Sequence, residues 1–143
     1  MFLKRRGIFM LERRGSQMII ANNYKEIKDH FDFTDSIITD IKWNNPLDLS
    51  ITIDYYWDVQ ENREENRTFV LHFTDCLAVE YTMRKEVIGM SREDLHFDSL
   101  FTMIRFEHAA ADSSGFQHFR IYTFDYTEPL LQIICKQVQL EEV

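Results

Sequence analysis

Glycine and proline are scarce in this sequence, with only four Gly and two Pro among 143 residues. Linkers and low-complexity tails are rich in these residues, so their scarcity, together with 45% apolar residues, indicates a folded chain. The four glycines, Gly7, Gly15, Gly89 and Gly115, are too scattered to form a phosphate-binding loop. No apolar run approaches the ~20 residues that a membrane-spanning helix needs. A chain of this length is expected to form one domain that buries roughly 68% of its unfolded surface.

Motifs for metal binding and for nucleophilic catalysis are also missing. The histidines and cysteines show no His-x-x-x-His or Cys-x-x-Cys spacing, so we predict no metal site and no cofactor. Ser113 and Ser114 lie outside any Gly-x-Ser-x-Gly context, and no catalytic residue is assigned. Cys76 and Cys135 lie in apolar stretches. Free buried thiols in a reducing cytosol are the favoured interpretation, and a disulfide is the alternative.

Positively charged residues are few over most of the chain but are concentrated at its start. The net charge is −8, and five of the 16 Lys and Arg residues fall in residues 1–17, so the remainder is more acidic than the whole. An acidic body repels phosphate backbones, which argues against nucleic-acid binding and favours a partner with a basic surface. Residues 1–17 are interpreted as a translated leader or a disordered basic tail, and residues 18–143 as a single β-rich domain. The apolar run 8–11 is too short for a signal peptide.

The basic clusters near the N-terminus suggest where translation starts. Arg5-Arg6-Gly7 and Arg13-Arg14-Gly15 are each followed, after two further residues, by a methionine, Met10 or Met18. The codons AGG-AGG-GGN would spell a bacterial ribosome-binding site ahead of each methionine. We therefore expect Met10 or Met18 to be the true start, and CGN codons for these arginines would refute this hypothesis.

Strict alternation of apolar and polar residues over 47–58 is the most regular pattern in the chain. Successive side chains of a strand point to opposite faces, so this pattern predicts a strand with one face on a core. Residues 23–31 predict a short helix, with Asn23 as its cap and Glu26 completing a capping box. Further strands are predicted at residues 36–43, 69–73, 77–83, 95–107, 116–126 and 130–140, of which 95–107 is out of phase and is expected to be bulged or buried on both faces.

These elements predict a mainly β (α+β) fold. We expect a single, strongly twisted antiparallel meander sheet of about seven strands, open or curved into a half-barrel, with one short N-terminal helix against it. The apolar positions of the predicted strands should form the core: Ile37, Ile41, Leu49, Ile51, Ile53, Phe69, Leu71, Phe73, Leu77, Val79, Tyr81, Ile121 and Ile133.

Short segments near both ends of the predicted domain resemble a known group. Phe33-Thr34-Asp35-Ser36-Ile37-Ile38, the strand Leu49-Ser50-Ile51-Thr52-Ile53 and the turn Glu128-Pro129-Leu130 are similar to motifs of the YxiG-like group of small Firmicute proteins. That group is itself similar to polymorphic-toxin immunity protein domains. The resemblance covers roughly residues 24–141, and Thr34 stands where the group usually has His. It implies a gene neighbourhood of secreted toxins and an immunity role.

The expected function is therefore that of a non-enzymatic, cytoplasmic, bacterial immunity protein that neutralises a secreted toxin domain. A basic toxin surface would bind the polar face of the second strand and the loop after it, and the predicted partner-binding residues are Asp54, Tyr56, Asp58, Glu61 and Glu64. The alternative for these residues is a solubilising strand face with a charged hairpin tip.

Two other classes of function stay open. One is a small-ligand-binding protein or enzyme with a pocket at the open end of the sheet, in which His72, His118 and Arg120 would take part. The other is a homodimer formed through an edge strand and serving as a scaffold.

Overall fold

The structure, a computed structural model, describes residues 18–57, 67–109 and 111–143. The leader expected at residues 1–17 and the predicted partner residues Asp58, Glu61 and Glu64 lie outside the described residues. The elements follow in the order β2 (Met18–Ala21), α1 (Tyr24–His30), β3 (Ile37–Asn45), β4 (Asp48–Asp54), β5 (Thr68–Thr74), β6 (Ala78–Tyr81), α3 (Lys85–Ile88), the 3-10 helix η1 (Arg92–Asp94), α4 (Phe97–Leu100), β7 (Arg105–Ala109), β8 (Gln117–Tyr122), β9 (Leu131–Cys135) and β10 (Gln137–Glu142).

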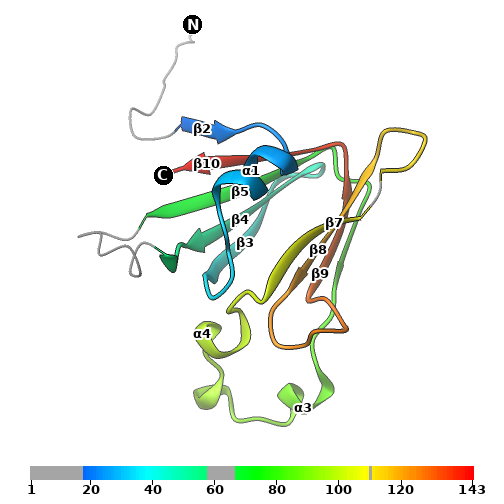
Figure 1. Cartoon of the computed structure of the whole chain (residues 1–143). Coiled ribbons are helices and arrows are strands. Elements are labelled where there is room, and N and C mark those ends of the chain that lie inside the picture. Colours follow the sequence, from blue (N-terminus) through cyan, green and yellow to red (C-terminus); the bar gives the residue numbers. More distant parts are fainter. Residues whose placement is uncertain (1–17, 58–66, 110) are drawn as a thin grey trace, which may run out of the picture.

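The strands form two antiparallel sheets, one of five strands in the order β2-β10-β5-β4-β3 and one of four in the order β6-β9-β8-β7 (Figure 1). The mainly β class with few helices is thus confirmed. The prediction of a single seven-strand sheet is wrong. The meander order is wrong too, because β10 pairs with β2 and β5, two strands that are far from it in the sequence.

The two sheets arise because two stretches of the chain pass from one sheet to the other. The predicted strand 130–140 is divided at Lys136 into β9 of the four-stranded sheet and β10 of the five-stranded sheet. Alongside it, the chain passes from β5 to β6 through Asp75, which has a φ of 56°. These two strands were predicted as separate members of one sheet. The buried positions change phase across Lys136, from Leu131, Ile133 and Cys135 to Val138 and Leu140, and this change of phase marks the crossing.

Helix α1 forms where it was predicted. The Asn23 side chain accepts a hydrogen bond from the Glu26 N–H at 2.9 Å, and Glu26 Oε1 accepts one from the Asn22 N–H at 2.8 Å. The first bond satisfies a free N–H group of the first turn, and the second holds the residue before the cap, one position earlier than in a regular capping box. Ile27 is the buried residue of the helix and ties it to the core.

The core lies between the inner face of the five-stranded sheet, α1 and the inner face of the four-stranded sheet. Leu49, Ile51 and Ile53 of β4 are buried as predicted. The other predicted core residues that are buried are Phe69, Leu71, Phe73, Ile121 and Ile133, whereas Ile37, Ile41 and Val79 are partly buried.

Two predicted core residues are exposed. Leu77 and Tyr81 show 67% and 51% of their surface to solvent. Both lie in or next to β6, which is a four-residue edge strand, so one side of each is left without a neighbouring strand. Alternation alone does not distinguish an edge strand from a central one.

The out-of-phase segment 95–107 is not one bulged strand. It contains the short helix α4 and then β7, and the change of period from helix to strand accounts for the broken phase. Helices α3 and α4 lie together at one end of the molecule, beyond the ends of β7, β8 and β9 (Figure 1). None of the helices in the described ranges has the length and apolar character to span a membrane.

Candidate functional site

The outer face of the five-stranded sheet is polar and acidic. Apart from Ser50, the side chains that β3, β4, β5 and β10 direct to this face are exposed or half-buried. Its charged residues are Asp40, Lys42, Asp48, Asp54 and Glu141, a clear excess of carboxylates. None of the three cavities described below is lined by residues of these four strands, so this face suits contact with another macromolecule better than enclosure of a small molecule in any of them.

Asp48 has a structural function on this face. Its carboxylate accepts hydrogen bonds from the Asn45 side chain at 2.7 Å and from the Asp75 N–H at 3.2 Å. These bonds hold the pKa of Asp48 below its ordinary value, with the Asn45 bond as the main cause. The carboxylate therefore joins the β3–β4 turn to the start of the crossing between the sheets.

Of the predicted partner-binding residues, the structure describes only Asp54 and Tyr56, at and just beyond the end of β4. Asp54 is the exposed last residue of β4 and accepts a 3.4 Å hydrogen bond from the Thr68 hydroxyl. Tyr56 is half-buried, its N–H donates to Ser36 Oγ at 2.9 Å, and its ring lies edge-on to Trp57. The structure brings Asp54 and Tyr56 close along the chain, although β4 ends before Tyr56.

A hydrogen-bonded chain of side chains crosses the same face. Asn44 Nδ2 donates to Ser50 Oγ at 2.5 Å, Ser50 Oγ lies 3.0 Å from His72 Nδ1, and His72 Nε2 lies 2.6 Å from Glu141 Oε1. Sequence reasoning placed His72 on a polar face but did not bring Ser50 and Glu141 to it. The four residues come from β3, β4, β5 and β10, so only the strand order and register reveal the chain.

The order serine, histidine, carboxylate is that of a hydrolase triad, but this arrangement lacks other parts of such a site. The backbone N–H groups around Ser50 belong to the central strands of a sheet, where the ladder uses them, so they supply no oxyanion hole. Ser50 is also buried, and no described cavity opens on it. This hydrogen-bonded network therefore has a structural function: it links neighbouring strands.

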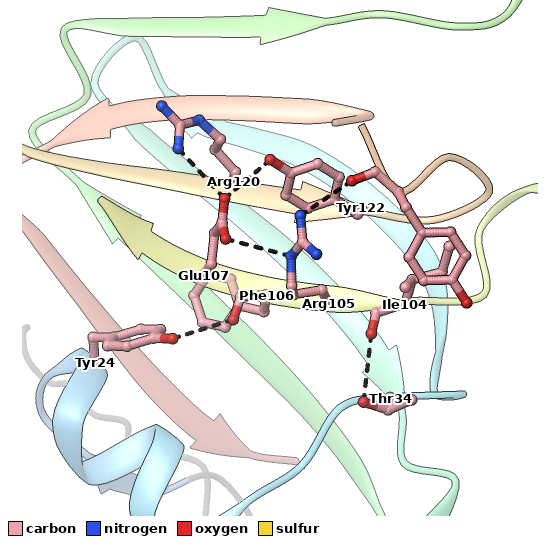
Figure 2. A network of polar contacts seen from close by, with 9 residues as sticks. Tyr24, Thr34, Ile104, Arg105, Phe106, Glu107, Arg120 and Tyr122 are labelled. Atoms are coloured by element: carbon pink, nitrogen blue, oxygen red, sulfur yellow. Dashed lines mark hydrogen bonds and ion pairs between the residues drawn. The ribbon is translucent and has the colours of Figure 1, made fainter. Parts of the chain in front are cut away.

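A second polar network lies on the four-stranded sheet (Figure 2). Glu107 receives three donors: Arg120 Nη1 at 3.4 Å, the Tyr122 hydroxyl at 3.0 Å and Arg105 Nε at 3.3 Å. The Arg105 guanidinium also lies over the Tyr122 ring, 4.0 Å from its centroid, and donates to the carbonyl of Tyr126. Two guanidinium groups share one carboxylate, so the network carries an excess positive charge.

A cavity of about 320 Å³ lies beside this network, between α1 and the edge strand β7. Tyr24 and Thr34 cross from the α1 side and donate hydrogen bonds to the carbonyls of Phe106 and Ile104, at 3.2 and 3.4 Å (Figure 2). Burial and the nearby Glu107 charge raise the pKa of Tyr24, so its hydroxyl remains a donor. The cavity is lined by Tyr24, Ile27, Lys28, Phe31, Asp32, Phe33, Thr34, Ile104, Arg105 and Phe106.

The pocket predicted from His72, His118 and Arg120 does not form. His118 and Arg120 line a shallow cavity of about 320 Å³ on the outer face of the four-stranded sheet, together with Glu80 and Gln132. His72 lies on the other sheet. The sequence places these residues on polar strand faces, but it does not show that the faces belong to different sheets.

An apolar groove of about 360 Å³ was not expected from sequence. It lies where α3, η1 and α4 meet the end of β6, and Tyr81, Ile88 and Phe97 are its exposed large side chains. All of its lining residues lie within 81–101. The groove was missed because the apolar residues at both ends of this stretch were assigned to the predicted strands 77–83 and 95–107.

Within the described residues, no group of three or more His, Cys, Asp or Glu side chains could hold a metal ion. Comparison of the chain with models of known protein families, with curated proteins and with solved structures found no match.

Proposed function

We propose that this chain is a cytoplasmic, non-enzymatic binding protein of the immunity type, which neutralises a secreted toxin domain by covering a basic surface of it. The observation that carries the proposal is the acidic outer face of the five-stranded sheet, where Asp40 and Asp54 are exposed and Glu141 is half-buried beside His72. The resemblance to the YxiG-like group supports the immunity role.

Complementary charge would act mainly on how fast and how selectively the partner binds. Exposed carboxylates raise the encounter rate with a basic surface and disfavour acidic competitors. Because these charges are in water, salt screens them, over a Debye length of about 8 Å at physiological ionic strength. Binding that uses this face should therefore weaken steeply as salt rises.

The test uses the toxin domain encoded beside this gene. The face variant combines Asp40→Lys with Asp54→Lys, and the matched control combines Glu86→Lys with Glu93→Lys, which changes the net charge equally on the α3–η1 segment. We expect the face variant to bind the toxin at least tenfold more weakly, with a shallower salt dependence, while the control binds as the wild type. Equal affinity and equal salt dependence in both variants would exclude the acidic face as the binding site.

The predicted residues Asp54, Tyr56, Asp58, Glu61 and Glu64 are tested separately. Charge reversal at Asp58, Glu61 and Glu64 together with Tyr56→Ala should weaken toxin binding further if the loop after β4 extends the interface. Circular dichroism of each variant checks that the fold is retained. Unchanged toxin affinity in a folded variant would confine the interface to the sheet.

A second candidate function is the binding of a small organic anion in the cavity between α1 and β7. The observation that favours it is the pairing of Lys28 and Arg105 with apolar walls from Ile27 and Phe106. A thermal-shift screen with aliphatic and aromatic carboxylates tests it. A ligand that stabilises the wild type but not Arg105→Gln would support this function, and a screen without any stabilising carboxylate would reject it.

A further inference from the structure

The two cysteines lie at the place where the chain passes twice between the sheets. On one side of this place β5 pairs with β10, with Thr74 opposite Gln137. On the other side β6 pairs with β9, and the Leu77 N–H donates to the carbonyl of Ile134 at 2.7 Å. The short connections between these pairs run antiparallel and side by side, and each of them carries or adjoins one cysteine.

Continuing the β5–β10 register, in which Thr74 lies opposite Gln137, places Cys76 opposite Cys135. The β6–β9 register is one residue out of step, with Ala78 opposite Ile134, so the two registers meet at the cysteines through a one-residue irregularity. The Cys76 N–H donates to the carbonyl of Leu47 at 2.7 Å, so it points away from the strand that holds Cys135. This is the arrangement of a non-hydrogen-bonded cross-strand pair, in which Cα atoms approach to about 4.5 Å. That distance lies inside the range of about 4.4–6.8 Å that disulfides span. Each thiol donates to a backbone carbonyl, Cys76 Sγ to Phe73 at 3.4 Å and Cys135 Sγ to Gln137 at 3.5 Å, and an interaction between the two thiols shifts the pKa of both.

We propose that Cys76 and Cys135 are a modification site for hydroperoxides, which oxidise the pair to a disulfide that fastens the two sheets together. Both cysteines are free and buried in the structure, and the proposed reaction starts from this reduced pair. This inference does not depend on the proposed binding function.

The chemistry takes two steps with hydrogen peroxide as the oxidant. The Cys76 thiolate attacks one peroxide oxygen, the O–O bond breaks, and hydroxide leaves and takes up a proton to form water. Cys76 is then a sulfenic acid. The Cys135 sulfur attacks the Cys76 sulfur, an S–S bond forms, the S–O bond breaks, and the oxygen leaves as water with the Cys135 proton. Two thiols lose two electrons and two protons in total, and one peroxide becomes two waters.

The surroundings assign the order of attack. Cys76 is 8% exposed and Cys135 is 0% exposed, so a small oxidant reaches Cys76 first. The interaction with the Cys135 thiol lowers the pKa of Cys76, against burial and the neighbouring charges of Asp48 and Asp75, which raise it. The same interaction and burial raise the pKa of Cys135. Cys76 is therefore the attacking thiol and Cys135 the resolving one.

The main test counts free thiols after oxidation of the folded protein. The full chain is treated with a small excess of hydrogen peroxide, quenched with catalase, unfolded in urea and alkylated with iodoacetamide before intact mass analysis. We expect the untreated protein to take up two alkyl groups and the oxidised protein none, until dithiothreitol restores both. Two alkylated cysteines after peroxide treatment, or a disulfide-linked dimer, would overturn the proposal.

Single variants test the order of attack. Cys135→Ala leaves Cys76 without a resolving thiol, so its sulfenic acid should accumulate and react with dimedone. Cys76→Ala leaves only the buried Cys135, which should stay unmodified under the same treatment. Dimedone labelling of Cys76→Ala but not of Cys135→Ala would reverse the assignment and overturn this part of the proposal.

Thermal unfolding provides a readout that does not need a variant. A disulfide across this long loop should raise the unfolding midpoint of the oxidised wild type by on the order of 10 °C, because the link restricts the unfolded chain. An oxidised protein with a lower midpoint than the reduced one would show that the link distorts the crossing, and it would contradict the proposed geometry.

Discussion

At the scale of single residues, the hydrogen-bonded network of Ser50, His72 and Glu141 links three neighbouring strands. His72 contacts Ser50 through one ring nitrogen and Glu141 through the other, so removing either neighbour changes what the other gains from the contact. This makes the network suitable for a double-mutant cycle, in which the coupling between two positions is measured directly.

We predict that Ser50→Ala and Glu141→Gln are not additive. Each should lower the free energy of unfolding by about 1–2 kcal/mol, and the double variant should differ from the sum by more than about 0.5 kcal/mol. Urea unfolding measures all of the variants. The control cycle pairs Thr52→Ala with Glu141→Gln and should be additive, and additivity in both cycles would show that the tie through His72 has no energetic weight.

The lowered pKa of Asp48 links a single carboxylate to stability in acid. A carboxyl group whose pKa is depressed on folding stabilises the native state above its unfolded pKa, near 3.8, and loses that effect as the pH falls through the folded value. Asp48→Asn should therefore flatten the decline of stability below about pH 4. Thermal melts from pH 5 to 2 test this, and Asp40→Asn removes the same charge from the same face as a control. A decline as steep as in the wild type would contradict the prediction.

At the scale of elements, the hairpin between β7 and β8 depends on one glycine conformation. Gly115 has a φ of +90°, which strains any residue with a Cβ atom, although nothing in the structure lies within 4 Å of where that atom would be. Gly89 follows α3 at a φ of −81°, an ordinary value for other residues.

Gly115→Ala should therefore lower the free energy of unfolding by about 1 kcal/mol or more, through backbone strain alone, whereas Gly89→Ala should be neutral or slightly stabilising. Chemical denaturation of the two variants measures the difference. Equal effects at the two positions would mean that the hairpin relaxes to a different turn.

Elements also show how far the sequence could predict this structure. Helix α1 and the buried positions of β4 and β5 follow from local rules, a capping residue and strict alternation, and they are confirmed. The division at Lys136 was missed because 130–140 was taken as one strand, although the buried positions change phase there, from Cys135 to Val138. For the candidate site, the sequence indicated a polar face around Asp54. The partners of His72 and of Glu107 were hidden, because they come from strands that only tertiary pairing brings together.

At the scale of the whole molecule, aromatic side chains join the two sheets and α1 into one core. Phe119 of the four-stranded sheet contacts Phe73 of the five-stranded sheet at 5.7 Å between ring centroids, and Tyr24 of α1 at 5.9 Å. It is fully buried. Removing this ring would therefore weaken the packing of both sheets and of α1.

Phe119→Ala should lower the free energy of unfolding by about 3–5 kcal/mol, a large part of the total for a domain of this size. Phe97→Ala is the matched control, because Phe97 is 58% exposed, and it should cost far less. Urea titrations followed by circular dichroism and by tryptophan fluorescence measure both. Separate transitions for the two probes in the wild type would show that the sheets unfold independently.

The position of β10 also determines when the strands can pair during synthesis of the chain. Strand β2 is near the start of the described chain, yet its pairing partner is β10, so β2 has no neighbour until residues 137–142 have been synthesised. At a synthesis rate of ~5–20 residues per second, the roughly 115 residues between β2 and β10 take about 6–23 s. Once residues 68–74 have been synthesised, the edge of β5 that β10 later covers is open to pairing with other chains until β10 follows. A nascent chain stalled before β10 is therefore the form of this protein most exposed to aggregation and to proteolysis.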